Sequence, residues 1–351
     1  MNALIDIFPV ALIFFFMLNA HLCKPLNEIN SDCLSLETTR YHRGFFAVAV
    51  VFHHLSQITK SGFIFPFFAN VGYLCVAVFF FFSGYGLQKS YIEKSEKYKK
   101  GFLLKRIPSV LFPYVLFMII YWVANSLSGT TYSFADIFEN FKNGSLLVTY
   151  SWFMICIIAF YLFFWVFMII CKKRYSMIII CGLVWYALWI LFCVFMNYGS
   201  WWYNTSHLLA AGIAWATYED KITGFIKQRY RIIAPAALVC LVALLVFQGF
   251  ISLPFISTIL PEIISLIFVF CVILLSMKIR IGNRILGFLG EISLEVYLIH
   301  GLILTFSQNL IQNDLLLCAA VIAVSIPLAF VIHLVLSFAL KKYKSIVDKR
   351  L

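Results

Sequence analysis

The sequence predicts an all-α, polytopic bundle of transmembrane helices. Of its 351 residues, 63% are apolar and only 12% are charged, about half the charged share of a soluble domain. Too few polar side chains remain to cover a water-soluble surface, so a soluble enzyme, a disordered chain and a coiled coil are excluded. A series of apolar runs long enough to cross a bilayer completes the argument.

Eleven apolar runs are predicted to be spanning helices. The run at 4–22 lacks the basic start and small-residue cleavage site of a signal peptide, so we expect a retained helix. The run at 203–218 is the weakest, since it is short and contains His207. The eleven runs lie at 4–22, 43–60, 64–87, 107–127, 149–171, 176–197, 203–218, 232–250, 255–277, 288–308 and 315–340.

Lysine and arginine are distributed very unevenly between the two sides of this arrangement. One side holds 25 of the 27 basic residues, and the other keeps only Lys60 and Lys142. The positive-inside rule makes the first side cytoplasmic, which places the N-terminus outside and the C-terminus inside. The net charge of +12 is therefore explained by the orientation of the protein in the membrane, and no nucleic-acid partner is predicted from it. The basic segments are 24–43, 89–106, 172–174, 221–231, 278–284 and the tail from 341.

The basic stretch at 88–106 has two interpretations. The simpler one is topogenic charge that faces anionic lipid. The other is a docking surface for an anionic cytoplasmic substrate. The ten cysteines add no chemistry, because nine lie in or beside apolar runs and no C-x-x-C pair occurs, so neither a disulfide framework nor a metal site is predicted.

Ionisable side chains inside predicted spans are functional candidates, because they are costly to bury in lipid. In the second span, Arg43 and His54 are eleven residues apart. That spacing returns to the same helix face with a rise of about 16 Å. We therefore expect Arg43 at the cytoplasmic entrance and His54 beyond mid-membrane on one stripe, with His53 about 100° away.

The tenth predicted span carries Glu295, Tyr297 and His300. His300 reaches a depth close to that of His54, so the two neutral imidazoles are expected to share a polar cavity. The alternative for His300 is a hydrogen bond to a neighbouring helix.

Five short motifs follow one another along residues 40–300. They are Arg43-x10-His54; Phe79-Phe80-Phe81-Phe82-Ser83-Gly84-Tyr85; Phe102-Leu103-Leu104-Lys105-Arg106 with Pro113-Tyr114; Ser151-Trp152-Phe153; and Ile292-Ser293 with Tyr297-Leu298-x-His300. In this order they resemble the acyltransferase family 3 membrane proteins, which acylate hydroxyls of surface sugars and related acceptors. The chain departs from the family at Ser109, where many members have a second arginine.

The resemblance implies a ten-helix acyltransferase-like core at residues 31–351. Residues 1–30 would then be an extra N-terminal transmembrane helix with its cytoplasmic link. It also implies acyl-CoA, in particular acetyl-CoA, as a donor substrate from the cytosol, with no permanently bound cofactor. The acceptor would be a hydroxyl of an envelope polysaccharide or lipid-linked glycan at the inner membrane. A homo-oligomer is compatible with this class.

The resemblance also assigns roles to residues. His54 would be the general base, since a neutral imidazole can take the acceptor's proton near neutral pH, and His300 would be its catalytic partner. Arg43, Lys105, Arg106 and Ser83 would bind the CoA donor. Trp152, Tyr297 and Glu295 would contact the acceptor. For Ser83 a helix-packing role is the alternative, and for Trp201 and Trp202 an aromatic belt at the lipid interface is favoured.

Two other functions are compatible with the sequence. Intramembrane His, Glu and Arg side chains also suit a proton-coupled transporter, although the sequence contains no inverted repeat of the kind such proteins have. The chain could instead be a channel that supplies acyl groups to a separate transferase.

Overall fold

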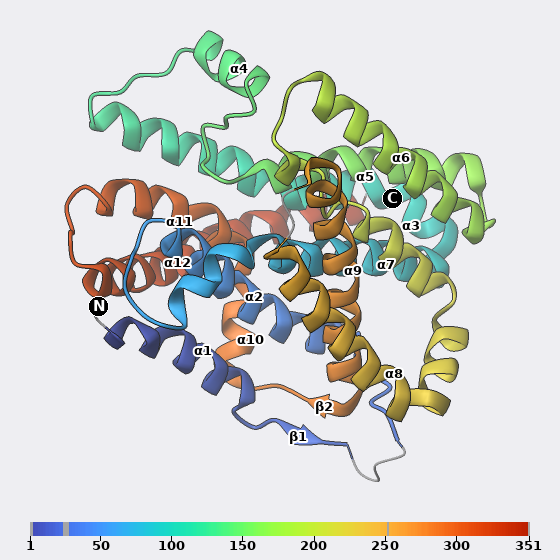
Figure 1. Ribbon diagram of the computed structural model, residues 1–351. Coiled ribbons are helices and arrows are strands. Elements are labelled where there is room, and N and C mark those ends of the chain that lie inside the picture. The colour runs from blue at the N-terminus through green and yellow to red at the C-terminus, as the bar shows by residue number, and fades with distance from the viewer. Residues whose placement is uncertain (1–2, 24–27, 251–252, 350–351) are drawn as a thin grey trace. The chain divides into compact units, whose positions relative to one another are not determined.

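The computed structural model describes residues 3–23, 28–250 and 253–349, and these are mostly helical (Figure 1). The elements are α1 (Ile7–Met17), β1 (His21–Leu22), α2 (Leu36–Ser56), α3 (Gly72–Leu127), α4 (Phe134–Lys142), α5 (Trp152–Cys171), α6 (Tyr175–Phe195), α7 (Leu208–Thr217), α8 (Glu219–Gln248), α9 (Pro254–Lys278), β2 (Ile279–Arg280), α10 (Arg284–Glu291), α11 (Ser293–Ser307) and α12 (Asp314–Asp348).

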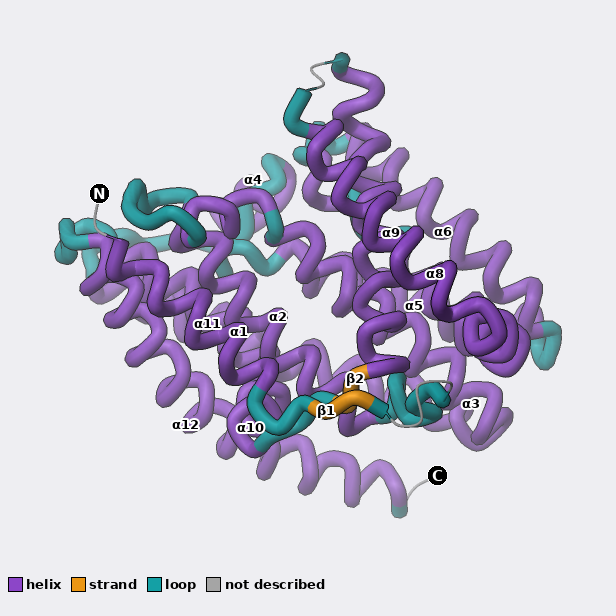
Figure 2. Tube along the Cα trace, turned by 60° about the horizontal axis from the view of Figure 1, so that its bottom comes forward, coloured by secondary structure: helices purple, strands orange, loops and turns teal. Residues whose placement is uncertain are grey.

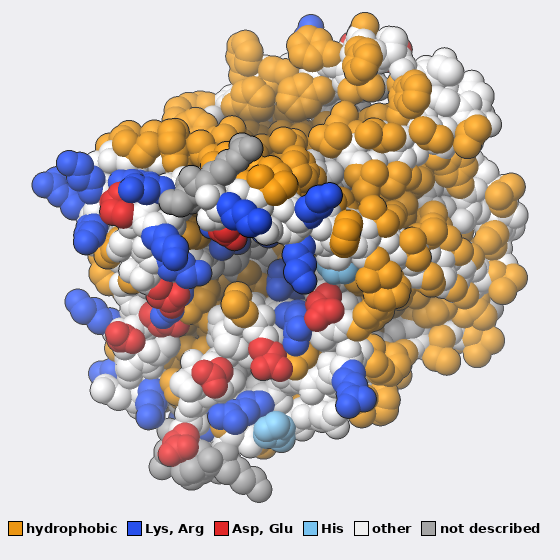
Figure 3. Space-filling model, turned by 180° about the vertical axis from the view of Figure 1, so that it is seen from behind, with side chains coloured by type: hydrophobic (Ala, Val, Ile, Leu, Met, Phe, Trp, Pro, Cys, Tyr) orange, Lys and Arg blue, Asp and Glu red, His pale blue; other side chains and the backbone are white. Residues whose placement is uncertain are grey.

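The prediction of an all-α, multi-pass membrane protein is confirmed. Within the described residues, six helices are long and apolar enough to cross a bilayer, namely α3, α5, α6, α8, α9 and α12. The broken pair α10–α11 makes a seventh if it is one span. Hydrophobic side chains accordingly cover a broad area of the face in Figure 3, while charged side chains gather elsewhere on it.

The predicted count of eleven spans, with ten in the core, is not confirmed. The 56-residue α3 takes in the 64–87 run from Gly72 onward and the whole 107–127 run, with a non-helical residue at Ser95. The arginines and histidines of α2 lower its apolar content, and α1 and α7 are short. By length and hydropathy, α1, α2 and α7 are therefore not among the candidate spans.

The chain divides into two compact units, each formed by two separate stretches. Unit 1 comprises Met1–Lys89 and Asn204–Ser293, and unit 2 comprises Ser90–Tyr203 and Leu294–Leu351. The predicted division into residues 1–30 and 31–351 stays a prediction.

In unit 1, glycines allow α2 and α10 to approach closely. A Cβ added at Gly44 would lie 2.5 Å from the carbonyl oxygen of Leu286, and one at Gly290 would overlap the backbone of Arg40. The residues just after α1 pair with those just after α9 in the antiparallel ladder of β1 and β2, in which His21 lies opposite Arg280 (Figure 2).

In the same unit, α3 crosses α7 at a second pair of glycines. A Cβ at Gly84 would overlap the carbonyl oxygen of Leu209, and one at Gly212 would overlap that of Phe81. Small residues that allow such backbone contact are typical of membrane helix pairs. Within the Ser83-Gly84 motif, Gly84 therefore makes the helix-packing contact. Its neighbour Ser83 is half-buried.

We expect Gly84→Ala to lower the stability of the fold by about 1–3 kcal/mol, because the new methyl group forces α3 and α7 apart. Gly86→Ala is the matched control, since nothing lies within 4 Å of a Cβ there. The thermal midpoints of the two purified variants test this. Equal midpoints would show that the α3–α7 contact adjusts without loss.

In unit 2, α11 is the buried central helix. Residues 295–302 are all buried, as expected for a helix that is covered on every side. Its neighbour α12 is linked to it by His333 and Glu295, and both helices lie at the red end of the colour bar in Figure 1. Three of the predicted site residues, Glu295, Tyr297 and His300, are therefore in the interior of this unit.

Candidate functional site

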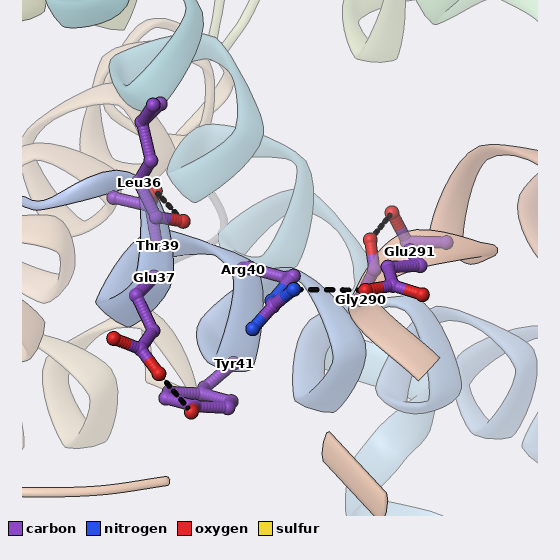
Figure 4. Close-up of polar contacts among 8 residues, drawn as sticks. Leu36, Glu37, Thr39, Arg40, Tyr41, Gly290 and Glu291 are labelled. Atoms are coloured by element: carbon purple, nitrogen blue, oxygen red, sulfur yellow. Dashed lines mark hydrogen bonds and ion pairs between the residues drawn. The ribbon is translucent and has the colours of Figure 1, made fainter. Parts of the chain in front are cut away.

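The N-terminal end of α2 is anchored by polar contacts. The Ser35 side chain caps the helix by accepting a hydrogen bond from the Thr38 backbone N–H. Arg40 donates to the Glu291 carboxylate over 2.8 Å, and the Tyr41 hydroxyl donates to Glu37 over 2.6 Å (Figure 4). Arg40 thereby ties the start of α2 to the end of α10, where Glu291 lies 251 residues later in the sequence.

The Arg43 and His54 side chains extend from one unbroken helix. Because α2 is continuous from Leu36 to Ser56, the eleven-residue spacing does place the two on one face, about 16 Å apart along the axis. Both residues are half-buried. Their chemical roles stay predictions.

A chain of hydrogen bonds connects the two adjacent histidines. The Nδ1 atom of His53 lies 3.0 Å from the Phe68 carbonyl oxygen, which can only accept, so Nδ1 carries the His53 proton. Its Nε2 atom then accepts from the amide nitrogen of Gln57 at 3.3 Å. The amide oxygen of Gln57 lies 3.4 Å from Nδ1 of His54. This assigns the proton of His54 to Nδ1 and leaves Nε2 as its basic nitrogen.

His53 packs against the start of α3. A Cβ added at Gly72 would overlap the His53 ring, so the imidazole lies directly on the start of α3. The two rings are tilted by 60° with centroids 4.7 Å apart. His53 thus contacts the backbone at Phe68 and Gly72, while His54 contacts the side chain of Gln57. The functional contrast between the two neighbours stays a prediction.

His300 lies in unit 2, in a buried aromatic cluster. Its side chain is fully buried, and Nδ1 lies 3.2 Å from the Val296 carbonyl oxygen one turn earlier. The ring stacks on Tyr150, with centroids 5.7 Å apart and planes at 13°. The cavity predicted to be shared by His300 and His54 stays a prediction, since His54 belongs to unit 1.

Tyr150 is the residue in this cluster that the sequence analysis missed. Its φ is +64°, a left-handed value that is strained for a bulky side chain. The Tyr297 hydroxyl donates to the Tyr150 carbonyl oxygen at 2.5 Å. The hydroxyl of Tyr297, predicted to contact the acceptor, is therefore engaged in holding this turn. The only sequence signal was the position of Tyr150, immediately before Ser151-Trp152-Phe153.

The tryptophans near this cluster differ in burial. Trp152 is half-buried, and its ring centroid lies 6.4 Å from that of Trp202. Trp202 is 1% exposed, and its carbonyl oxygen accepts from Trp189 Nε1, whereas Trp201 is 57% exposed. An aromatic-belt position thus fits Trp201, while Trp202 is a core residue of unit 2.

A groove of about 710 Å³ follows the C-terminal half of α12 in unit 2. We refer to it as the α12 groove. The Nδ1 atom of His333 pairs with Glu295 Oε1 at 2.9 Å in its wall. His333 was missed although it satisfies the criterion that was applied to α2, an ionisable residue inside an apolar run. The groove is lined by Glu295, His333, Leu336, Ser337, Leu340, Lys341, Lys344, Ser345, Asp348 and Lys349.

The two basic residues predicted on α3 have different surroundings. Lys105 forms an ion pair with Asp348 and so lies at the α12 groove. Arg106 donates from Nε to the Tyr98 hydroxyl at 3.2 Å, and its guanidinium lies 5.7 Å from the Tyr98 ring centroid. Through its pairing with Asp348, Lys105 lies beside the α12 groove.

Among the described residues, no group of three or more His, Cys, Asp or Glu side chains is placed to hold a metal ion.

One comparison with known proteins identifies a family. The family model of acyltransferase family 3, described as an acyltransferase domain, matches residues 40–339. The match begins just before Arg43 and includes most of α2, all of α11 and most of α12. No curated protein and no solved structure matches the chain.

Proposed function

The chain belongs to acyltransferase family 3, and from this we propose that it is an integral-membrane O-acyltransferase. It moves an acyl group, in the first instance acetyl, from cytoplasmic acyl-CoA to a hydroxyl of an envelope polysaccharide or lipid-linked glycan. The observation that carries the proposal is the oriented imidazole of His54 on the helix that also carries Arg43, within the residues that the family model matches.

The proposed reaction uses the basic nitrogen of His54. Nε2 takes the proton of the acceptor hydroxyl while the oxygen attacks the thioester carbonyl, and the carbon–sulfur bond then breaks. The leaving CoA thiolate receives the proton from the imidazolium, which returns His54 to its neutral form. Gln57 is a positioning residue in this scheme, because its amide oxygen holds the proton of His54 on Nδ1.

Cationic side chains support the donor assignment. Arg43 is proposed to meet phosphate or pantetheine carbonyl groups at the cytoplasmic entrance through charge-assisted hydrogen bonds. The length of an extended pantetheine arm is similar to the ~16 Å rise along α2 between Arg43 and His54. His300 is proposed as the second catalytic imidazole, held in place by the stacked ring of Tyr150.

A comparison of cells with and without the protein tests the proposed function. Mass spectrometry of their envelope glycans should show acyl esters only where the chain is present. The His54→Ala variant should behave like the deletion. An unchanged ester content in the deletion strain would contradict the proposed function.

The orientation in the inner membrane follows from the charge distribution. We expect a reporter fused to the C-terminus to be cytoplasmic. We also expect an N-terminal tag to be cleaved by protease that is added outside cells whose outer barrier is permeabilised. Both expectations follow from the positive-inside rule, because 25 of the 27 basic residues lie on one predicted side. A protected N-terminal tag would show that the first apolar segment does not span.

A further inference from the structure

The segment before α1 contacts the loop that follows α2 in unit 1. Asp6 immediately precedes α1 and lies outside the residues that the family model matches, which begin at position 40. Its carboxylate accepts hydrogen bonds from the backbone N–H groups of three consecutive residues, over 2.7, 3.0 and 2.9 Å. These residues are Phe63, Ile64 and Phe65. One side chain of the N-terminal segment thus fixes three successive residues of the loop.

The loop is shaped to receive this carboxylate. The bonded N–H groups lie at the start of a 3₁₀ helix, Phe65–Asn70, where the first N–H groups of a helix have no partner within it. Ile64 at the N-cap supplies no side-chain hydrogen bond, so Asp6 does what a capping side chain does elsewhere. Gly62 has a φ of +95°, and a Cβ there would lie 2.6 Å from Oδ1 of Asp6. The close fit therefore requires glycine at this position.

The same 3₁₀ helix supplies the acceptor for His53. The Phe68 carbonyl oxygen lies 3.0 Å from Nδ1 of His53. The rings of Phe65 and Phe68 pack on Phe52, with centroids 5.6 and 5.4 Å away, and Phe65 is fully buried. The position of the Phe68 carbonyl thus depends on how this helix is held at its start, which is where Asp6 binds it.

The position of that carbonyl decides which nitrogens of two imidazoles carry a proton. With the oxygen in place, the His53 proton is on Nδ1 and the Gln57 amide oxygen faces His54. If the oxygen moves away, His53 can carry its proton on Nε2. That N–H needs an acceptor, so the Gln57 amide turns and its own N–H faces Nδ1 of His54. His54 then has its proton on Nε2, the nitrogen that the proposed reaction uses as a base.

We propose that Asp6 is a positioning residue for His54. It holds the loop after α2 so that the Phe68 carbonyl keeps the proton of His53 on Nδ1, and Gln57 transmits this arrangement to His54. The N-terminal segment thereby contributes to the site from outside the residues that the family model matches. The inference rests on the proposed role of His54 as the base.

Nitrogen NMR of the full-length protein in lipid, with isotope-labelled histidine, tests the proposal without an activity assay. At a pH where the imidazoles are neutral, the nitrogen shifts report which ring nitrogen carries the proton, and spectra of His53→Ala and His54→Ala assign the signals. We expect both protons on Nδ1 in the unaltered protein. In Asp6→Ala, a large part of both histidines should move to the Nε2–H form. Unchanged tautomers in the folded variant would overturn the proposal.

Acyl-transfer kinetics measure the consequence for the reaction. We expect Asp6→Ala to lower kcat per folded molecule by about three- to tenfold, less than the roughly ten- to a hundredfold typical of a direct partner of a functional imidazole. The KM for acetyl-CoA should change little. Asp6→Asn keeps an oxygen that can accept from Ile64 and Phe65. In both measurements it should lie between the unaltered protein and the alanine variant, and it provides the comparison if the alanine variant folds poorly.

Phe8→Leu is the control for a general loosening of α1. The Phe8 ring packs on that of Phe52, with centroids 6.3 Å apart, and the substitution leaves the Asp6 carboxylate in place. We expect a lower thermal midpoint, because buried ring contacts are lost, and an unchanged kcat. A loss of kcat equal to that of Asp6→Ala would show that loosening alone is the cause and would overturn the positioning role.

A double variant tests the route through His53. Removing His53 also removes the source of the wrong tautomer, so Asp6→Ala combined with His53→Ala should turn over as fast as His53→Ala alone. Losses that multiply would overturn this route. If the tautomers respond to Asp6→Ala but the unaltered protein transfers no acyl group, the positioning of His54 stands and the proposed function fails. Unchanged tautomers in a protein that does transfer acyl groups would show the reverse.

Discussion

Replacing His54 with alanine is expected to lower the turnover of acyl transfer by about 10²–10⁴-fold, the usual loss when a general base is removed. The variant should still insert and bind donor, because the hydrogen bond from His54 to Gln57 is long, at 3.4 Å. Turnover per folded molecule and the donor dissociation constant measure the two effects separately.

His53→Ala is the control for this experiment, since it removes the same chemical group from the adjacent position. Its imidazole donates to the Phe68 carbonyl oxygen and lies on Gly72. We expect a lower folded yield, because a hydrogen bond within a membrane protein contributes about 0.6 kcal/mol on average and the packing on α3 is lost as well. Turnover per folded molecule should remain substantial. Equal turnover in the two variants, or a greater loss at His53, would contradict the assignment of His54.

Replacing Gln57 with leucine is expected to lower kcat by about ten- to a hundredfold, the range seen when a residue that orients a functional imidazole is lost. Leucine has a similar length but can neither donate to His53 nor accept from His54. The proton of His54 is then no longer held on Nδ1, so part of the population has Nε2 protonated and cannot act as a base. The KM for acyl-CoA should change little, because Gln57 makes no proposed donor contact.

Gln57→Glu provides the rescue that a purely structural role would not show. The carboxylate keeps an acceptor for Nδ1–H of His54 and loses only the amide donor to His53. We expect kcat to recover most of the loss seen with leucine. A glutamate variant as slow as the leucine variant, or a leucine variant with normal kcat, would contradict the positioning role.

The features that could be predicted from the sequence depend on composition and on local spacing. The fold class follows from the apolar share of the chain, because backbone groups in lipid must be satisfied within helices. The common face of Arg43 and His54 follows from helix geometry alone and needs only that α2 be continuous. The family was likewise recognisable from short motifs, of which Arg43-x10-His54 and Tyr297-Leu298-x-His300 lie on single helices.

The features that could not be predicted depend on which helices meet. The pairing of Arg40 with Glu291 joins positions 251 residues apart, and that of Tyr297 with Tyr150 joins positions 147 residues apart. Neither has a local signal in the sequence. Tyr297 illustrates the consequence, since its contact with the Tyr150 carbonyl oxygen could not be read from the sequence, while its role at the acceptor stays a prediction. His333 was visible as an ionisable residue in an apolar run, but only the fold shows that it pairs with Glu295.

Acyl transfer by the purified protein tests the central claim most directly. The chain is reconstituted alone in lipid vesicles with acetyl-CoA labelled in the acetyl group, and candidate envelope glycans are supplied as acceptors. The account predicts label in an ester on a glycan with the unaltered protein and almost none with His54→Ala. Label that crosses the membrane and stays unattached to every acceptor, at the same rate in both proteins, would contradict it and would indicate a channel that supplies acyl groups to another enzyme.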